Sequence, residues 1–200
     1  MIYLDHRGCG RSTGEKETWH LDQWANDLEV FCKTLGIDSP IVFGQSFGGM
    51  VAMRYVARYP AGVSKLVLSS TAAKFRLDET VKMMRKLGGH RAADVAHEFF
   101  SNPSKAAYET YGEVCLPLYS NPNLPAAGTF RDRAIERPEV AFHFFSDEMA
   151  TMDMRAEIAN ITCPTLVIGG TIDPVTPNIC SEAIADAIGE NARLQMLEGC

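Results

Sequence analysis

The feature that most constrains this chain is the pentapeptide Gly-Gln-Ser-Phe-Gly at residues 44–48, which fits the pattern G-x-S-x-G. The apolar run at residues 41–43 is typical of a buried parallel strand, and residues 50–57 continue without Pro or Gly, as in a helix. A strand that turns at once into a helix forces strained backbone geometry and leaves no room for side chains two residues to either side of the serine. We therefore expect an exposed Ser46 at a helix N-terminus, where the N–H of Phe47 can help to stabilise an oxyanion.

Strand patterns alternate with helix patterns at both ends of the chain. Alternation of this kind implies a parallel sheet with right-handed crossovers. The predicted class is α/β, with a mostly parallel sheet and flanking helices. The predicted strands are residues 1–5, 41–43, 65–69, 164–168 and 192–197, and the predicted helices are residues 24–35, 50–57 and 181–188.

Residues 72–158 do not follow this alternation, and they are too many for a single crossover connection. They hold ten of the eighteen aromatic residues and two helical runs, at residues 79–87 and 92–100. We interpret residues 72–158 as a helical cap inserted into a sheet domain formed by residues 1–71 and 159–200. Most of the aromatic side chains would form the core of the cap, and a few could line an apolar pocket over the serine.

The second chemical landmark is Gly-Gly-Thr-Ile-Asp-Pro at residues 169–174, directly after a predicted strand. Open α/β sheets place their sites at the carboxyl ends of strands, and the prolines stiffen the turn that carries Asp173. Asp173 follows Ser46 by 127 residues, which agrees with the order serine, acid, histidine of a catalytic triad. Asp-Pro is also a common turn pair, so the same residues could simply form a turn.

Composition excludes several classes of function. A net charge of -6 and a pI near 5.4 argue against nucleic acid and anionic membrane surfaces as main partners. The sequence has no run of 18 apolar residues, which a helix would need to span a bilayer, and its N-terminus lacks the pattern of a signal peptide. The six cysteines are scattered without a C-x-x-C pair, which favours a reduced, cytoplasmic compartment and makes a zinc site unexpected.

The chain resembles the α/β-hydrolase superfamily and, within it, the proline iminopeptidase-like branch. The resemblance rests on the turn Asp-His-Arg-Gly-Cys-Gly-Arg-Ser at residues 5–12, on residues 44–48 and on residues 169–174. It implies acyl transfer to water, with Ser46 as nucleophile, Asp173 orienting a histidine and the Phe47 N–H holding half of the oxyanion, without metal or organic cofactor. Residues 44–48, where the strand turns into the helix, are here called the elbow. Gln45 and Phe47 differ from the Gly and Trp that the best-known iminopeptidases have in this turn.

The resemblance also implies parts that the sequence does not contain. The family's triad histidine follows the last strand, yet every histidine here precedes Asp173, and we expect these five in surface or packing roles: His6, His20, His90, His97 and His143. The family's strand beside the elbow strand, and the oxyanion loop after it, would lie upstream of Met1. We therefore expect a chain truncated at both ends, and expect residues 1–200 alone to be inactive and poorly soluble.

The substrate class is open at this point. A small amide or ester is expected, and the resemblance favours a short peptide with a free N-terminal residue. Glu113 or Glu148 could bind its ammonium group, although exposed cap surfaces carry such carboxylates anyway. The alternatives are a carboxylesterase or lactonase with an apolar pocket, and a non-catalytic ligand-binding protein on a hydrolase fold. The sequence does not determine the oligomeric state.

Overall fold

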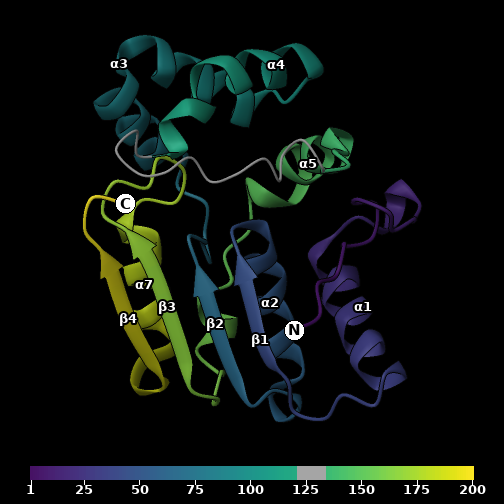
Figure 1. The fold of residues 1–200 in the computed structure, drawn as a ribbon. Coiled ribbons are helices and arrows are strands. Elements are labelled where there is room, and N and C mark those ends of the chain that lie inside the picture. Colours follow the sequence, from purple (N-terminus) through teal and green to yellow (C-terminus); the bar gives the residue numbers. More distant parts are fainter. Residues whose placement is uncertain (121–133) are drawn as a thin grey trace.

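A parallel sheet of four strands forms the centre of the molecule (Figure 1). The computed structural model describes residues 1–120 and 134–200. The strands lie side by side in the order of the sequence, each parallel to the next. This arrangement confirms the predicted α/β class, and its strands are β1 (Ile41–Gln45), β2 (Lys65–Ser69), β3 (Thr165–Gly170) and β4 (Ala192–Leu197).

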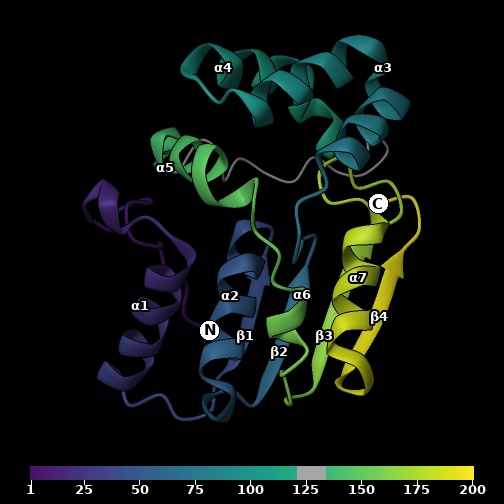
Figure 2. The same cartoon turned by 180° about the vertical axis from the view of Figure 1, so that it is seen from behind.

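The helices that flank the sheet lie on one of its faces (Figure 2). They are α1 (Leu21–Thr34), α2 (Phe47–Arg58), α6 (Arg155–Ile158) and α7 (Asn178–Ile188), with short 3-10 turns at Lys16–Thr18 (η1), Pro60–Gly62 and Gly189–Asn191. Leu66 and Leu68 of β2 pack under them and are fully buried, as are Val51 and Met53 of α2. In the part of the chain that the structure describes, no helix is both long and apolar enough to cross a membrane.

The opposite face of the sheet is open, and this corrects one sequence expectation. The apolar run at residues 41–43 predicts a strand buried on both faces, but Ile41 and Phe43 of β1 are 64% and 63% exposed. The register places Phe43 beside Val67 of β2 and Val67 beside Leu166 of β3, so an apolar row crosses this face. The strand prediction is confirmed, and the expectation of burial is wrong for these two side chains.

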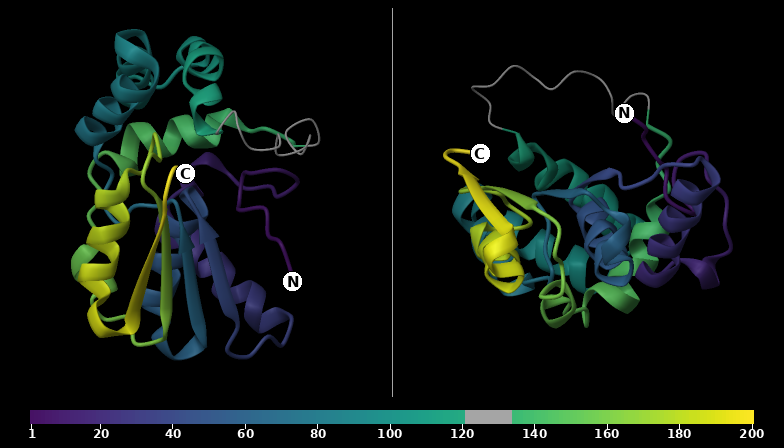
Figure 3. Two further views of the ribbon diagram at one scale, coloured as in Figure 1. Left: turned by 60° about the vertical axis from the view of Figure 1, so that its left-hand side comes forward. Right: turned by 90° about the horizontal axis from the view of Figure 1, so that it is seen from below.

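The strand predicted at residues 1–5 is absent. These residues have no secondary structure, and Met1, Ile2 and Tyr3 are exposed. Figure 3 shows the N-terminal segment running apart from the strands. A strand exists only through hydrogen bonds to a neighbour, and none of the four described strands pairs with this segment, so an apolar pattern alone was not enough.

Helices from the middle of the chain lie beyond the carboxyl ends of the strands (Figure 1). They are α3 (Leu77–Ser101), η3 (Leu116–Tyr119), α4 (Lys105–Val114), α5 (Pro138–Phe144) and the π-helix η5 (Phe145–Met149). Gly89, with a φ of 75°, kinks α3 between the two predicted helical runs. Phe99 stacks within this layer on Phe100, Tyr111 and Phe145. Residues 121–133 of the predicted cap lie outside the described residues, and the division into two domains stays a prediction.

Candidate active site

Ser46 occupies a strained turn between β1 and α2, with its side chain exposed. Its φ of 50° lies in the left-handed region, which costs a residue with a side chain about 1–3 kcal/mol. Hydrogen bonds fix the turn on both sides: the Ser46 N–H donates to the Ser69 carbonyl at 3.0 Å, and the Ser46 carbonyl accepts from Gly49 N at 2.9 Å and Met50 N at 3.2 Å. The Thr71 hydroxyl donates to the same carbonyl at 2.7 Å. The serine is thus presented at the N-terminus of α2, as the sequence predicts.

Two glycines make this turn possible, and only one of them was expected. A Cβ at Gly44 would collide with the Gly48 carbonyl oxygen and lie 2.7 Å from the Cα of Gly49. A Cβ at Gly49 would lie 2.5 Å from the Thr71 hydroxyl. A Cβ at Gly48 would meet only Nε2 of His6, at 3.9 Å, an ordinary contact. The steric argument therefore holds for Gly44, is wrong for Gly48, and applies instead to Gly49.

Asp173 lies in the loop after β3, at the same edge of the sheet as Ser46. Its carboxylate accepts hydrogen bonds from Val175 N at 2.9 Å, Thr176 N at 2.8 Å and the Thr176 hydroxyl at 3.0 Å. One strand, β2, separates β1 from β3, so the two strand ends are roughly 10 Å apart. Ser46 and Asp173 therefore follow two strands that end at the same edge of the sheet.

The histidines lie in four different places. His20 is the N-cap of α1, where its Nδ1 accepts from Gln23 N at 3.2 Å. The His143 ring packs edge-on against Trp19 at a centroid distance of 6.0 Å. His90 and His97 belong to α3, and His6 lies beside Phe47. Within the described residues, no histidine forms a hydrogen bond with Ser46 or Asp173.

His6 is the histidine that packs against the elbow. Its ring meets Phe47 edge-on at 5.5 Å, and its Nδ1 is buried without a hydrogen-bond partner among the described residues. Burial lowers the pKa of His6, against the opposing pull of the Asp27 and Asp5 carboxylates. The folded protein therefore favours a neutral imidazole at this position, which the sequence motif did not reveal.

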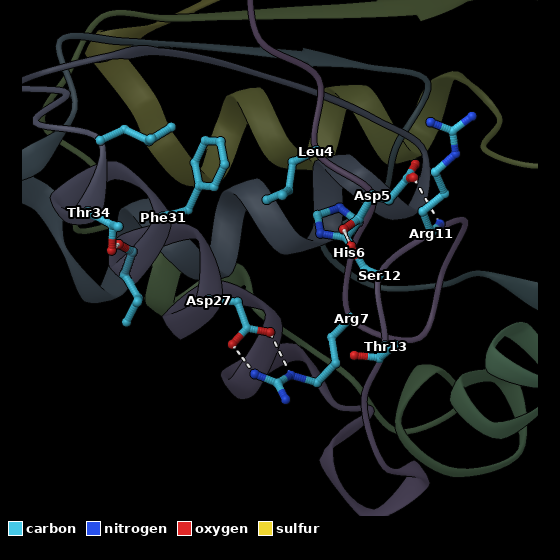
Figure 4. Close-up of a pocket in the computed structure, with 12 residues that line it drawn as sticks. Leu4, Asp5, His6, Arg7, Arg11, Ser12, Thr13, Asp27, Phe31 and Thr34 are labelled. Carbon is cyan, nitrogen blue, oxygen red and sulfur yellow. Dashed lines mark hydrogen bonds and ion pairs between the residues drawn. The ribbon is translucent and has the colours of Figure 1, made fainter.

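The turn at residues 5–12 is a structural brace that borders a cleft of about 590 Å³ (Figure 4). Arg7 forms a two-pronged ion pair with Asp27 of α1, at 2.5 and 2.7 Å. Burial raises the pKa of Asp27, but hydrogen bonds from Arg7 and Gln23 outweigh it and hold that pKa below its usual value. Asp5 accepts from Arg11 N at 3.1 Å, so the turn is closed on itself.

Glu148, a predicted candidate for binding an ammonium group, is engaged elsewhere. Its carboxylate accepts from the Leu21 N–H at 2.8 Å and so satisfies a free donor at the N-terminus of α1. This contact ties η5 to α1 across 127 residues of sequence. Glu113, the other candidate, is exposed on α4.

A second cleft, of about 360 Å³, lies between η1 and α5. Its lining residues are Lys16, Trp19, Glu139, Phe142, His143 and Ser146. Neither cleft is lined by Ser46 or Asp173, so the expected apolar pocket over the serine is not one of them.

Among residues 1–120 and 134–200, no group of three or more His, Cys, Asp or Glu side chains could hold a metal ion.

The C-terminus of the chain lies against the loop that carries Asp173. The Cys200 carbonyl accepts from Ile172 N at 2.8 Å, and the Leu197 carbonyl accepts from Thr171 N at 3.1 Å. Gly199 N donates to the Thr171 hydroxyl at 3.0 Å. Residues 197–200 therefore run beside the candidate acid.

Comparison with known proteins agrees with this geometry. The family described as alpha/beta hydrolase fold matches residues 1–200. The chain belongs to this family. It is 28% identical over 225 residues to a proline iminopeptidase of Lactobacillus delbrueckii subsp. lactis, an alignment that covers 100% of this chain and 73% of the relative.

Solved structures of α/β hydrolases show the same fold. A proline iminopeptidase from Mycobacterium smegmatis superposes with a TM-score of 0.69 at 22% identity, covering 98% of this chain and 70% of that one. An enol-lactonase from Burkholderia xenovorans LB400 gives a TM-score of 0.63 at 23% identity, with 96% and 70% covered. Proteins with different chemistry share this architecture, so the fold alone does not select a substrate.

The half-buried His6, whose Nδ1 is shielded from water, predicts a pH dependence of stability. Because its pKa is lowered in the folded state, the unfolded chain binds the proton more readily. The contribution of neutral His6 is complete above the unfolded pKa of about 6.5 and is lost as the pH falls through the lower folded pKa. Urea unfolding between pH 8 and pH 5 should show this loss, and His6→Phe should flatten it. The exposed His90, changed to Gln, is the control, and an equal flattening there would refute the assignment.

Proposed function

We propose that this protein is a serine hydrolase that cleaves small amides or esters through an acyl-enzyme. The observation that carries the proposal is the exposed Ser46 at a φ of 50°, on the N-terminus of α2. In G-x-S-x-G nucleophiles the serine likewise lies at the start of a helix, with a strained backbone that hydrogen bonds hold in place. Asp173 at the same sheet edge, held by three hydrogen bonds, supports the same reading.

In this mechanism Ser46 attacks the substrate carbonyl while a histidine takes its proton, and Asp173 orients that histidine. The N–H of Phe47, the first residue of α2, donates to the developing oxyanion, and water then releases the acyl group. These steps need no metal or organic cofactor.

The substrate we favour is a short peptide with a free N-terminal residue, as the similarity to proline iminopeptidases supports. One observation favours a second candidate, a carboxylesterase or lactonase: the Glu148 carboxylate already accepts from Leu21 N and is less available to an ammonium group. Helices α3 to η5, which lie over the strand ends, would form the cap that encloses either substrate. All six cysteines are free thiols, in keeping with a cytoplasmic enzyme.

Labelling with a fluorophosphonate tests the nucleophile. The probe should modify Ser46, and Ser46→Ala should lower ester turnover on the order of 10⁶-fold. Asp173→Asn should lower turnover on the order of 10⁴-fold, because the histidine loses its orientation. Mass spectrometry that places the adduct on Ser12, Ser69 or Ser70 would contradict the proposal, and so would Ser46→Ala with full activity.

The two substrate classes are separated by a free and a blocked amine. An iminopeptidase should hydrolyse a prolyl naphthylamide, and acylation of the proline nitrogen should abolish turnover because the charge that a carboxylate binds is gone. A matched phenyl acetate assay reports esterase activity. Equal rates on free and blocked prolyl substrates, together with rapid ester hydrolysis, would exclude the iminopeptidase and support the esterase or lactonase.

A further inference from the structure

Four rings from distant parts of the chain meet at the elbow: His6, Trp24, Phe47 and Phe144, here called the Phe47 cluster. Phe47 lies at its centre and is touched edge-on by Trp24 at 4.8 Å, by Phe144 at 5.1 Å and by His6 at 5.5 Å. Trp24 and Phe144 also touch each other, at 5.9 Å. Edge-to-face contact at these distances is the favoured geometry of aromatic pairs, so each ring limits the freedom of its neighbours.

The outer rings are themselves immobilised. Trp24 is fully buried in α1, and its indole N–H donates to the Arg7 carbonyl at 3.0 Å. Phe144, the last residue of α5, is 1% exposed. The Glu148 contact with Leu21 N follows Phe144 by one turn and fastens the same segment to α1. The Phe47 ring is thus clamped between helix α1 and the segment formed by α5 and η5.

The backbone of Phe47 needs such a clamp. The strained φ of Ser46 persists only where the surroundings determine the turn on every side. Hydrogen bonds fix the Ser46 carbonyl and its N–H, and the three ring contacts of the Phe47 cluster hold the side chain of the next residue, Phe47. Since the Phe47 N–H is the proposed oxyanion donor, the packing of its ring sets where that donor points.

We propose that Phe144 is a positioning residue. It belongs to the segment that covers the elbow, and it holds the Phe47 ring and thereby the Phe47 N–H that would donate to the oxyanion. This inference rests on the proposed function of Ser46 and Phe47. Phe144 lies 97 residues from Phe47 in sequence and belongs to the layer over the strand ends. The packing of this layer on Phe47 therefore also sets the direction of the proposed oxyanion donor.

The test compares Phe144→Ala and Phe144→Leu with Phe99→Ala in the full-length protein. Phe99 is an equally buried aromatic residue whose ring partners, Phe100, Tyr108, Tyr111 and Phe145, all belong to α3, α4 and η5. Phe144→Ala should lower kcat by about 10- to 100-fold with KM changed less than about twofold, because a displaced donor weakens only the transition state. Phe144→Leu should recover part of kcat, and Phe99→Ala should leave kcat within about threefold of the parent.

Hydrogen exchange gives a readout that needs no activity. The amides of Gly49 and Met50, which donate to the Ser46 carbonyl, should exchange at least about fivefold faster in Phe144→Ala than in Phe99→Ala. Equal exchange, or equal loss of kcat in the two variants, would overturn the inference. If the parent protein neither turns over esters nor reacts at Ser46, the proposed function has failed. The exchange rates then still decide whether Phe144 holds the elbow.

Discussion

The backbone of Ser46 is the constraint on which the rest of the site depends. A φ of 50° at a residue with a side chain is unfavourable, so the fold must hold it from several directions. The absence of a side chain at Gly44 lets β1 approach the first turn of α2, and the Thr71 hydroxyl locks the Ser46 carbonyl. The sheet supplies a rigid base for this turn, and its parallel strands bring Asp173 to the same edge.

The layer over the strand ends contacts the loops and helices of the sheet next to both proposed catalytic residues. The Thr80 hydroxyl at the start of α3 donates to the Val175 carbonyl at 2.8 Å, two residues from Asp173. Phe144 packs on Phe47 at the other side of the site. The segments that would enclose a substrate are therefore coupled to the groups that would act on it, which is how closure can complete a site in capped enzymes.

Local patterns were sufficient for the elbow and for four strands, because each is specified by a few consecutive residues. The prediction of a strand at residues 1–5 is wrong because a strand must pair with a neighbour, which its own sequence cannot supply. The G-x-S-x-G pattern predicts a steric role for Gly48 that belongs to Gly49, because the pattern shows spacing and not which atoms approach. The contacts of Glu148 and Phe144 join residues about a hundred positions apart, and neither has a local signature.

Whether Ser46 is a nucleophile whose oxyanion is held by the N–H of Phe47 can be seen in a crystal structure of the protein after reaction with a fluorophosphonate. We expect phosphorus bonded to the Ser46 oxygen, a positive φ at Ser46 close to 50°, and a phosphoryl oxygen about 2.7–3.1 Å from the Phe47 nitrogen. An adduct whose phosphoryl oxygen points away from Phe47, or a relaxed turn with negative φ at Ser46, would contradict it.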